Sequence, residues 1–388
     1  MTTPLREDQS SYLFTDFIRF VAMCAIIFQH SFIVDKAILI TDYPSVLVFF
    51  FMKVMAKIGS ISFFIVSGFL LSGALERYSS VDYLNKRVRS IFKPYVLFVF
   101  LYLLLDVLGA FFGETRITSL VDLPAFVATQ LLGILFFTSY WFIFNYFISV
   151  MILLAFRKYL YERWLGVTLF CCTLVYAINA HLEVFTPHHT TAFVGFTFFL
   201  WLGANLKKHE LRFWTFIETT PYWKMTVAMV LALAVDFYET YYLLEKGATV
   251  VDSSLKFTNI LYALCVFVLL AKSGRNARFG VLNPRDETYP LYLIHPIFLK
   301  VINYALLPLL PAVSDALMLK DADDVSWLMI LLYQFGWFIT IYMLSLISVK
   351  IILYSPFRWV FGKQGRDGTS PLKSLKLFIN GVRNLKFR

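Results

Sequence analysis

The sequence predicts an all-α protein, a polytopic membrane bundle of about ten transmembrane helices with both termini in the cytoplasm. Three observations predict this fold class. Hydrophobic residues make up 59% of the chain against 15% charged residues, and the mean hydropathy is +0.70. Apolar runs long enough to cross a bilayer recur along the chain, and Lys and Arg gather in alternate loops. A soluble domain of this length cannot bury so much apolar surface, so the chain needs a bilayer as its solvent.

Ten apolar segments, bounded by charged residues, Gly or Pro, approach the roughly 17 to 25 residues that a spanning helix needs. They are 14–34, 58–75, 94–112, 140–156, 164–180, 191–206, 225–244, 257–272, 288–307 and 327–353. Two further apolar stretches are shorter. We expect 46–57, whose Lys53 and Lys57 share one helical face, to lie at the membrane interface, and 124–138 to be re-entrant.

The charge distribution predicts the orientation. Loops on one side of the ten segments hold 26 of the 35 Lys and Arg residues, and loops on the other side hold seven. Because cytoplasmic loops retain Lys and Arg, the richer side is predicted to be cytoplasmic. The net charge of +10 follows from this rule and from attraction to anionic lipid headgroups, so no nucleic-acid partner is expected.

The chain divides into a transmembrane domain, residues 1–361, and a basic cytoplasmic tail, residues 362–388. The tail mixes Leu, Ile, Val and Phe with Lys and Arg, which suits an amphipathic helix on an anionic membrane surface. A disordered basic tail fits its periodicity equally well.

The first apolar segment carries ionisable residues that are costly in lipid. Arg19 and His30 are eleven residues apart, about three helical turns, which puts them on one face roughly 16 Å apart along the axis. Asp16 lies on the same face, three residues before Arg19. Each charge at mid-membrane costs roughly 2.5–3.5 kcal/mol, which favours a functional interpretation. The structural alternative is an Asp16–Arg19 pair near one interface, with His30 reaching the other.

A second intramembrane histidine, His295, lies in the sequence Tyr292-Leu293-Ile294-His295-Pro296. Histidine titrates near neutral pH, so two histidines on different helices suit a proton relay or a general-base site. A packed, neutral histidine is the alternative.

Three other patterns have structural interpretations as good as functional ones. Ser67 and Gly68 are small residues that permit close helix packing, and no activating base for Ser67 is nearby in sequence. The histidines of the loop at 181–189 match no standard metal spacing, so we expect a solvated loop and no metal site. The cations of one cytoplasmic loop fit the topology rule, and they also suit a phosphorylated ligand; they are Lys86, Arg87, Arg89 and Lys93.

Five patterns, in order along most of the chain, together resemble the acyltransferase-3 family of bacterial integral membrane acyltransferases. They are Asp16 with Arg19 and His30; Phe64 to Leu71, which resembles F-x-x-S-G-F-L; the basic stretch from Lys86 to Tyr95; Tyr140-Trp141-Phe142; and Tyr292 to Pro296. One departure is Phe144-Asn145, where a Leu or Pro-rich continuation is common in the family.

The resemblance implies transfer of an acyl group, most often acetyl from acetyl-CoA, to a hydroxyl of a cell-surface glycan or its lipid-linked precursor, in the bacterial inner membrane. It implies acyl-CoA as a co-substrate, no bound cofactor, and membrane lipid as a partner. The enzyme either stands alone or relies on a separate partner, such as a glycan-assembly protein. His30 is then the general base or a transient acyl carrier. Arg19, held by Asp16, orients the donor or stabilises developing negative charge. The cations of the basic loop meet the CoA phosphates.

A proton-coupled transporter or flippase is the main rival, with Arg19, His30 and His295 forming a path through the membrane. The sequence shows no inverted repeat, which disfavours it. An inactive relative that scaffolds a glycan-assembly complex is a third possibility.

Overall fold

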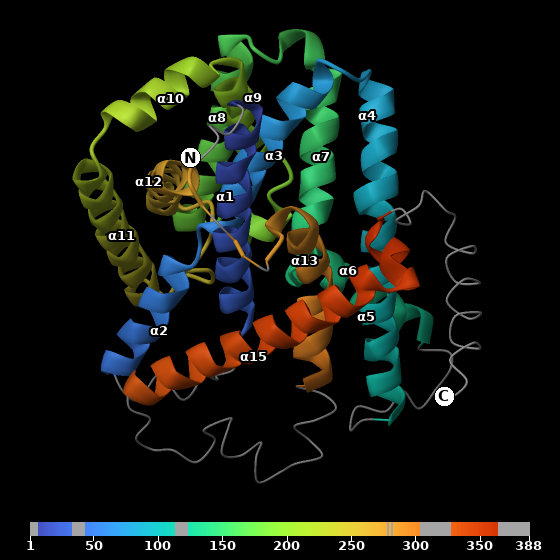
Figure 1. Ribbon diagram of the computed structural model, residues 1–388. Coiled ribbons are helices and arrows are strands. Elements are labelled where there is room, and N and C mark those ends of the chain that lie inside the picture. The colour runs from blue at the N-terminus through green and yellow to red at the C-terminus, as the bar shows by residue number, and fades with distance from the viewer. Residues whose placement is uncertain are drawn as a thin grey trace.

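The computed structural model describes residues 7–32, 43–112, 123–277, 279–280, 282–302 and 327–363. Within these ranges every regular element is helical and no strand occurs (Figure 1). The all-α fold class is therefore confirmed. Most of the predicted tail, 364–388, and the chain start, 1–6, lie outside the described residues, so the orientation of the termini stays a prediction.

The elements follow one another around a central first helix, α1 (Glu7–His30), which contacts α3, α12, α13 and α15 (Figure 1). The remaining helices are α2 (Tyr43–Met55), α3 (Gly59–Leu75), α4 (Ser80–Arg87), a π-helical turn (Val88–Phe92), α5 (Lys93–Phe112), α6 (Leu123–Phe137), α7 (Trp141–Ala155), α8 (Arg163–Leu182), α9 (Thr197–Lys208), α10 (Glu210–Thr219), α11 (Tyr222–Glu245), α12 (Phe257–Gly274), α13 (Pro284–Val301) and α15 (Trp327–Tyr354). Three short 3-10 turns are Arg157–Tyr159, His189–Thr191 and Pro356–Phe361.

Seven candidate spans in the described part of the chain are long and apolar enough to cross a membrane, against ten predicted. An eighth is added if α6 and α7, bent by 70° at their junction, form one broken span. This bend also fits the predicted re-entrant character of 124–138. Two predicted spans do not qualify within the described residues. The helix at 191–206, α9, has only 12 residues. The span at 288–307 is described only as far as residue 302, and its helix, α13, carries Arg285, Asp286, Glu287 and Lys300.

The segment 46–57 differs from the interfacial helix expected. It joins α3 in one apolar stretch, Val46–Leu75, that is long enough to span. Lys53 and Lys57 do share a face, but both pair with Asp252 of the loop between α11 and α12, at 3.4 Å and 3.2 Å. The two lysines therefore face the protein and not lipid headgroups.

The closest helix packing joins α3 to α9. A Cβ atom on Gly68 would lie 1.8 Å from the Leu200 carbonyl oxygen, and one on Gly203 would lie 1.9 Å from the Ile65 carbonyl oxygen. The two backbones touch because neither position has a side chain. Of these two helices, α3 is the one that packs against α1.

Candidate active site

Two cavities lie on either side of one wall. The first, here called the histidine cavity, has a volume of about 360 Å³ and is lined by His30, His188 and His189 together with Lys53, Lys57 and Asp252. The second, the cationic cavity, has a volume of about 280 Å³ and is lined by Arg19, Arg87, Arg285 and Lys363. Phe142 and Tyr292 line both, with ring centroids 5.8 Å apart. These two rings are therefore a shared wall.

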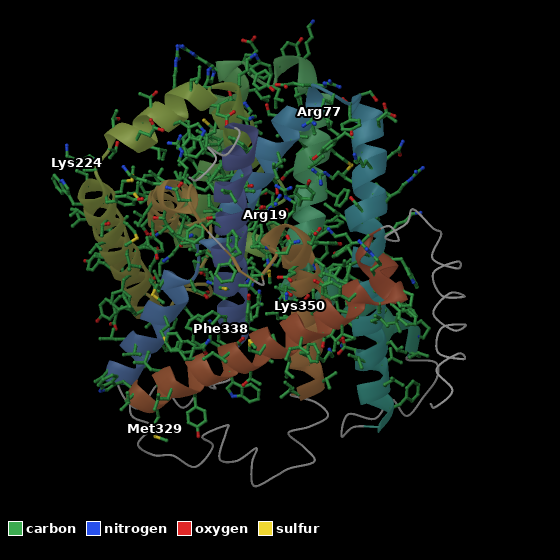
Figure 2. The ribbon with its side chains drawn as sticks, in the orientation of Figure 1. Arg19, Arg77, Lys224, Met329, Phe338 and Lys350 are labelled. Atoms are coloured by element: carbon green, nitrogen blue, oxygen red, sulfur yellow. The ribbon has the colours of Figure 1, made fainter. Side chains whose placement is uncertain are left out.

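Helix α1 reaches both cavities. Arg19 (labelled in Figure 2) lines the cationic cavity, and His30, eleven residues later, lines the histidine cavity. A helical rise of 1.5 Å per residue separates them by about 16 Å along the axis. The predicted common face therefore holds, but its two residues serve different cavities.

The structure brings His30 and His295 together, with ring centroids 5.7 Å apart. His30 is exposed to its cavity, while His295 is fully buried behind it. The Nδ1 atom of His295 lies 3.1 Å from the Leu291 carbonyl oxygen. A carbonyl only accepts, so Nδ1 carries the proton and Nε2 is the atom with a free lone pair. Among the described residues this Nε2 has no hydrogen-bond partner.

Tyr292 is held by the bend between α6 and α7. Its hydroxyl donates to the Ser139 carbonyl, and the hydroxyl of Tyr140 donates to the Leu293 carbonyl at 2.8 Å. These two reciprocal bonds fix α13 against the bend. The side chain of Phe142 packs its ring on the rings of Phe64 and Tyr292.

Trp141, the residue after the bend, packs its ring edge-on to His189 with centroids 5.2 Å apart. Asn145, one turn further along α7, donates to the Thr190 carbonyl at 2.8 Å and so holds the His189 segment in place. Burial lowers the pKa of His189 to about 3, and nearby Lys57 lowers it in the same direction. His189 is therefore neutral at neutral pH.

Several buried polar atoms of the histidine cavity have no partner in the described part of the chain. They belong to lining residues: Nδ1 of His189, Oγ of Ser139 and Oγ1 of Thr190. Buried polar atoms are nearly always hydrogen-bonded, so these atoms call for a polar occupant. His188 and His189, in the loop expected to be solvated, are half-buried and line this polar cavity.

In the described part of the chain, the cationic cavity has four cationic lining residues and no acidic one. Behind the lining, Asp16 accepts from Arg19 at 2.7 Å and pairs with Arg285 at 3.6 Å, while Asp286 pairs with Lys363 at 2.6 Å. Two carboxylates thus pair with three of the four cations, and the fourth, Arg87, donates to the Tyr83 hydroxyl. This cavity is suited to an anion with more than one charge.

The π-helical turn shapes the mouth of this cavity, because Ser90 and Ile91 line it. Pro94 lacks the N–H that an α-helix would direct at the Ser90 carbonyl, which favours the wider turn. The Tyr289 hydroxyl donates to the Ile91 carbonyl at 2.5 Å. Gly362, with φ of +71°, packs where a Cβ would lie 2.5 Å from the Ser90 oxygen. Glycine is required there, since both the backbone angle and the contact exclude a side chain.

Of the four cations predicted to bind the donor, only Arg87 lines a cavity, where Nε donates to the Tyr83 hydroxyl at 2.9 Å. Lys86 is exposed and donates to the Tyr78 hydroxyl at 3.0 Å. Arg89 and Lys93 are also exposed. Arg87 is thus the member of the basic loop that lies at the cationic cavity, whereas Lys86, Arg89 and Lys93 lie on the exposed surface.

The two small residues of α3 also have different surroundings. Gly68 packs against α9, in agreement with the packing interpretation, whereas Ser67 lines the cationic cavity.

Five charged residues of the site were missed from the sequence: Lys53 and Lys57, which were predicted to lie at the membrane interface, and Arg285, Lys363 and Asp252. Arg285 had a usable signal, because it lies seven residues before Tyr292 on α13 and therefore shares its face. Lys363 was assigned to the tail, and Asp252 lies in a loop with no periodicity to place it. Neither carries a local signal.

A family model described as an acyltransferase domain matches residues 12–355, which include every one of the patterns named above. No curated protein and no solved structure matches the chain. The match spans most of the sequence, and it covers α1 with both Arg19 and His30 as well as the wall formed by Phe142 and Tyr292. The chain therefore belongs to the acyltransferase-3 family of membrane acyltransferases.

Proposed function

We propose that this membrane acyltransferase moves an acetyl group from acetyl-CoA to a hydroxyl of a cell-surface glycan or its lipid-linked precursor, in the bacterial inner membrane. One observation carries the proposal: Arg19 and His30, on a single helix, line two cavities that share one wall. The cationic cavity suits an anionic donor, and the histidine cavity, with its unpaired polar atoms, suits a hydroxyl-rich acceptor.

Topology supports the same assignment. The segments that supply Arg87, Arg285 and Lys363 belong to the loops richest in Lys and Arg, which are predicted to be cytoplasmic. Acyl-CoA is available on that side. The segments at 188–190 and 248–252, which line the histidine cavity, belong to loops on the predicted outer side.

The donor fits the cationic cavity in part. Guanidinium groups bind phosphate oxygens through paired hydrogen bonds, as the CoA phosphates require. A volume of about 280 Å³ is at the lower end of ligand cavities, which measure roughly 300–1,000 Å³. We therefore place the pantetheine arm inside the cavity and the nucleotide at its mouth.

The chemistry is then carried by His30. Its imidazole takes the proton of the acceptor hydroxyl as that oxygen attacks the thioester carbonyl carbon. The new C–O bond forms, the C–S bond breaks, and the CoA thiolate leaves with the proton as a thiol. The wall has to open for the acyl group to cross it. We place this opening at Phe142, which is held by ring packing on Phe64 and Tyr292, because the Tyr292 hydroxyl is bonded to the Ser139 carbonyl. The same placement serves a route in which His30 carries the acetyl group transiently.

The proposal is tested with the full-length protein in liposomes that contain the extracted envelope glycan of its host. Acetyl-CoA with a labelled acetyl group is added outside these liposomes, where it meets those protein molecules whose predicted cytoplasmic side faces outward. We expect label on the glycan. Movement of unmodified glycan across the bilayer, without transfer of label, would instead support the transporter.

Replacing Arg87 with Ala is expected to raise the KM for acetyl-CoA by about tenfold or more, since a hydrogen bond to a charged group is worth about 1.5–3 kcal/mol. Arg89→Ala, two residues away and exposed, is the matched control and should leave this KM within about twofold. Steady-state kinetics with a fixed acceptor concentration measure both. Equal effects of the two substitutions would assign the loop a role in topology and not in donor binding.

A further inference from the structure

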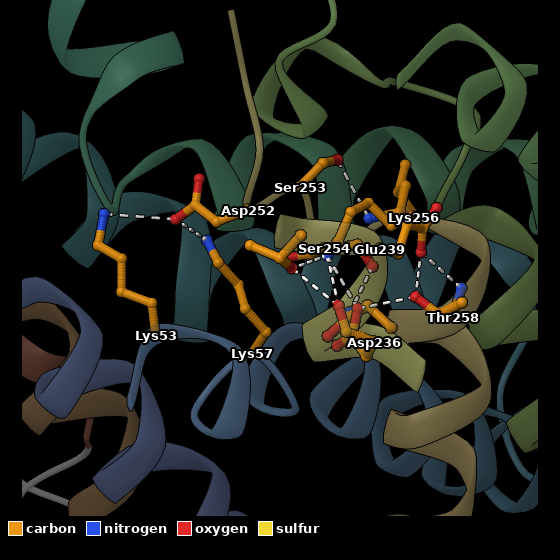
Figure 3. A network of polar contacts seen from close by, with 12 residues as sticks. Lys53, Lys57, Asp236, Glu239, Asp252, Ser253, Ser254, Lys256 and Thr258 are labelled. Carbon is orange, nitrogen blue, oxygen red and sulfur yellow. Dashed lines mark hydrogen bonds and ion pairs between the residues drawn. The ribbon is translucent and has the colours of Figure 1, made fainter. Parts of the chain in front are cut away.

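The histidine cavity is lined by unequal numbers of positive and negative side chains. Its charged lining residues, within the described chain, are Lys53, Lys57 and Asp252. One carboxylate oxygen of Asp252 serves both ammonium groups, at 3.4 Å and 3.2 Å (Figure 3). The three side chains are only 19%, 11% and 22% exposed. Two cations thus share one anion in a poorly solvated place.

Asp252 remains ionised in this setting. Its burial would raise the pKa, but the ammonium groups of Lys57 and Lys53 outweigh burial and hold the pKa of Asp252 well below its usual range. Protonation of a cavity histidine would add positive charge and not remove it. Among the described residues, the cavity lining therefore holds one more positive charge than negative charges.

The neighbouring carboxylates do not supply the missing negative charge. Asp236 pairs with Lys256 at 2.9 Å, and both are 1% exposed. Glu239 pairs with His181 at 2.6 Å and accepts from Thr258. Figure 3 shows this second cluster beside the Lys53–Asp252–Lys57 cluster, with the loop between α11 and α12 joining them. Neither Asp236 nor Glu239 lines the cavity.

Lys53 also lies over the rings of Phe49 and Phe32, with its ammonium 5.1 Å and 5.8 Å from their centroids. Aromatic faces attract a cation but leave its charge in place. A buried charge without a full counter-charge is costly, and a bound anion would remove that cost. An anionic occupant would therefore balance the excess positive charge of the described lining residues.

We infer that the acceptor in the histidine cavity is an acidic saccharide, whose carboxylate or phosphate binds Lys53 and Lys57 while a hydroxyl of the same molecule faces His30. This inference rests on the proposed function and narrows its acceptor class. The unpaired polar atoms of Ser139, His189 and Thr190 then meet the neutral hydroxyls of the sugar.

Binding of simple saccharide probes to the full-length protein in nanodiscs tests the inference without any donor. The probes are methyl glucuronide, glucose 1-phosphate and neutral methyl glucoside, and saturation-transfer NMR titration gives a Kd for each. We expect at least one anionic probe to bind about tenfold more tightly than the glucoside. A hydrogen bond between charged groups contributes about 1.5 kcal/mol or more, which corresponds to this factor in Kd. The two anionic probes distinguish a carboxylate from a phosphate.

Substitutions that change the charge count provide the decisive series. Lys53→Met keeps the length of the side chain and removes the excess charge, so the preference for the anionic probe should fall to about one. Asp252→Asn doubles the excess, so the preference should rise. Lys53→Arg keeps the charge and should keep the preference. CoA binding by each variant, at the other cavity, reports that the protein is folded.

Equal Kd values for anionic and neutral probes, or no binding of either anionic probe, would overturn the inference. So would a preference that neither Lys53→Met nor Asp252→Asn alters. If Lys53→Met does not fold, the comparison of wild type with Asp252→Asn still decides. Failure of the proposed function is separate, because it appears as absent transfer of label from acetyl-CoA in the liposome assay.

Discussion

Replacing His30 with Ala is expected to lower kcat for acetyl transfer by about 10²- to 10⁴-fold, the range that a general base contributes. The imidazole is exposed to its cavity, which α1 also lines with Ile26 and Gln29, and it is the side chain among these three that can accept a proton near neutral pH. Binding of CoA should stay within about twofold, because the donor groups Arg19 and Arg87 line the other cavity. Labelled-acetyl kinetics and CoA titration measure the two effects.

His209→Ala is the matched control for this substitution. His209 is exposed at the junction of α9 and α10 and lines neither cavity, so its loss should leave kcat within about twofold. Rapid acid quenching of the wild type with labelled acetyl-CoA separates the two routes, since only an acetyl-enzyme intermediate leaves label on the protein. Near-normal turnover by His30→Ala would exclude both roles for this histidine.

Replacing Gly68 with Ala is expected to prevent stable folding or to cost at least about 3 kcal/mol, the upper end for overpacking. The new Cβ would lie 1.8 Å from the Leu200 carbonyl oxygen and 3.0 Å from the Ala204 nitrogen. These atoms are backbone, so α3 and α9 would have to move apart. Thermal unfolding in detergent, followed by size-exclusion chromatography, measures the loss.

Gly73→Ala on the same helix is the control. A Cβ there would meet only the flexible end of Lys207, with its Cε 3.9 Å away. We expect a melting temperature equal to that of the wild type or slightly higher, since alanine is the better helix former. Equal stability of the two variants would mean that α3 and α9 are not in the close contact described.

Local patterns predicted the fold class and part of the site. Composition requires a membrane, and a helical repeat of 3.6 residues places Asp16, Arg19 and His30 on one face whatever surrounds them. The number of spans was less predictable, because α9 is short and α13 carries charges. Lys300, one of four charged residues on α13, is paired with Asp106 of α5, a partner about two hundred residues away in the chain.

Long-range packing decided the rest of the site. The basic loop gave no means of choosing Arg87 over Lys86, Arg89 and Lys93, because the choice depends on the π-helical turn and on which side of it faces α13. Likewise, 46–57 was predicted to lie at the interface because its two lysines share a face. Their partner, Asp252, is about two hundred residues away in the chain.

The sequence by itself determined that this chain is a helical membrane protein of the acyltransferase type and that Arg19 and His30 share one face of its first helix, since composition, motif order and helical repeat are local properties. Only the tertiary structure decided that these residues open into two cavities divided by Phe142 and Tyr292, and that Arg285, Lys363 and Asp252 complete them. Those positions come from different helices and loops, and their meeting depends on packing that no local period encodes.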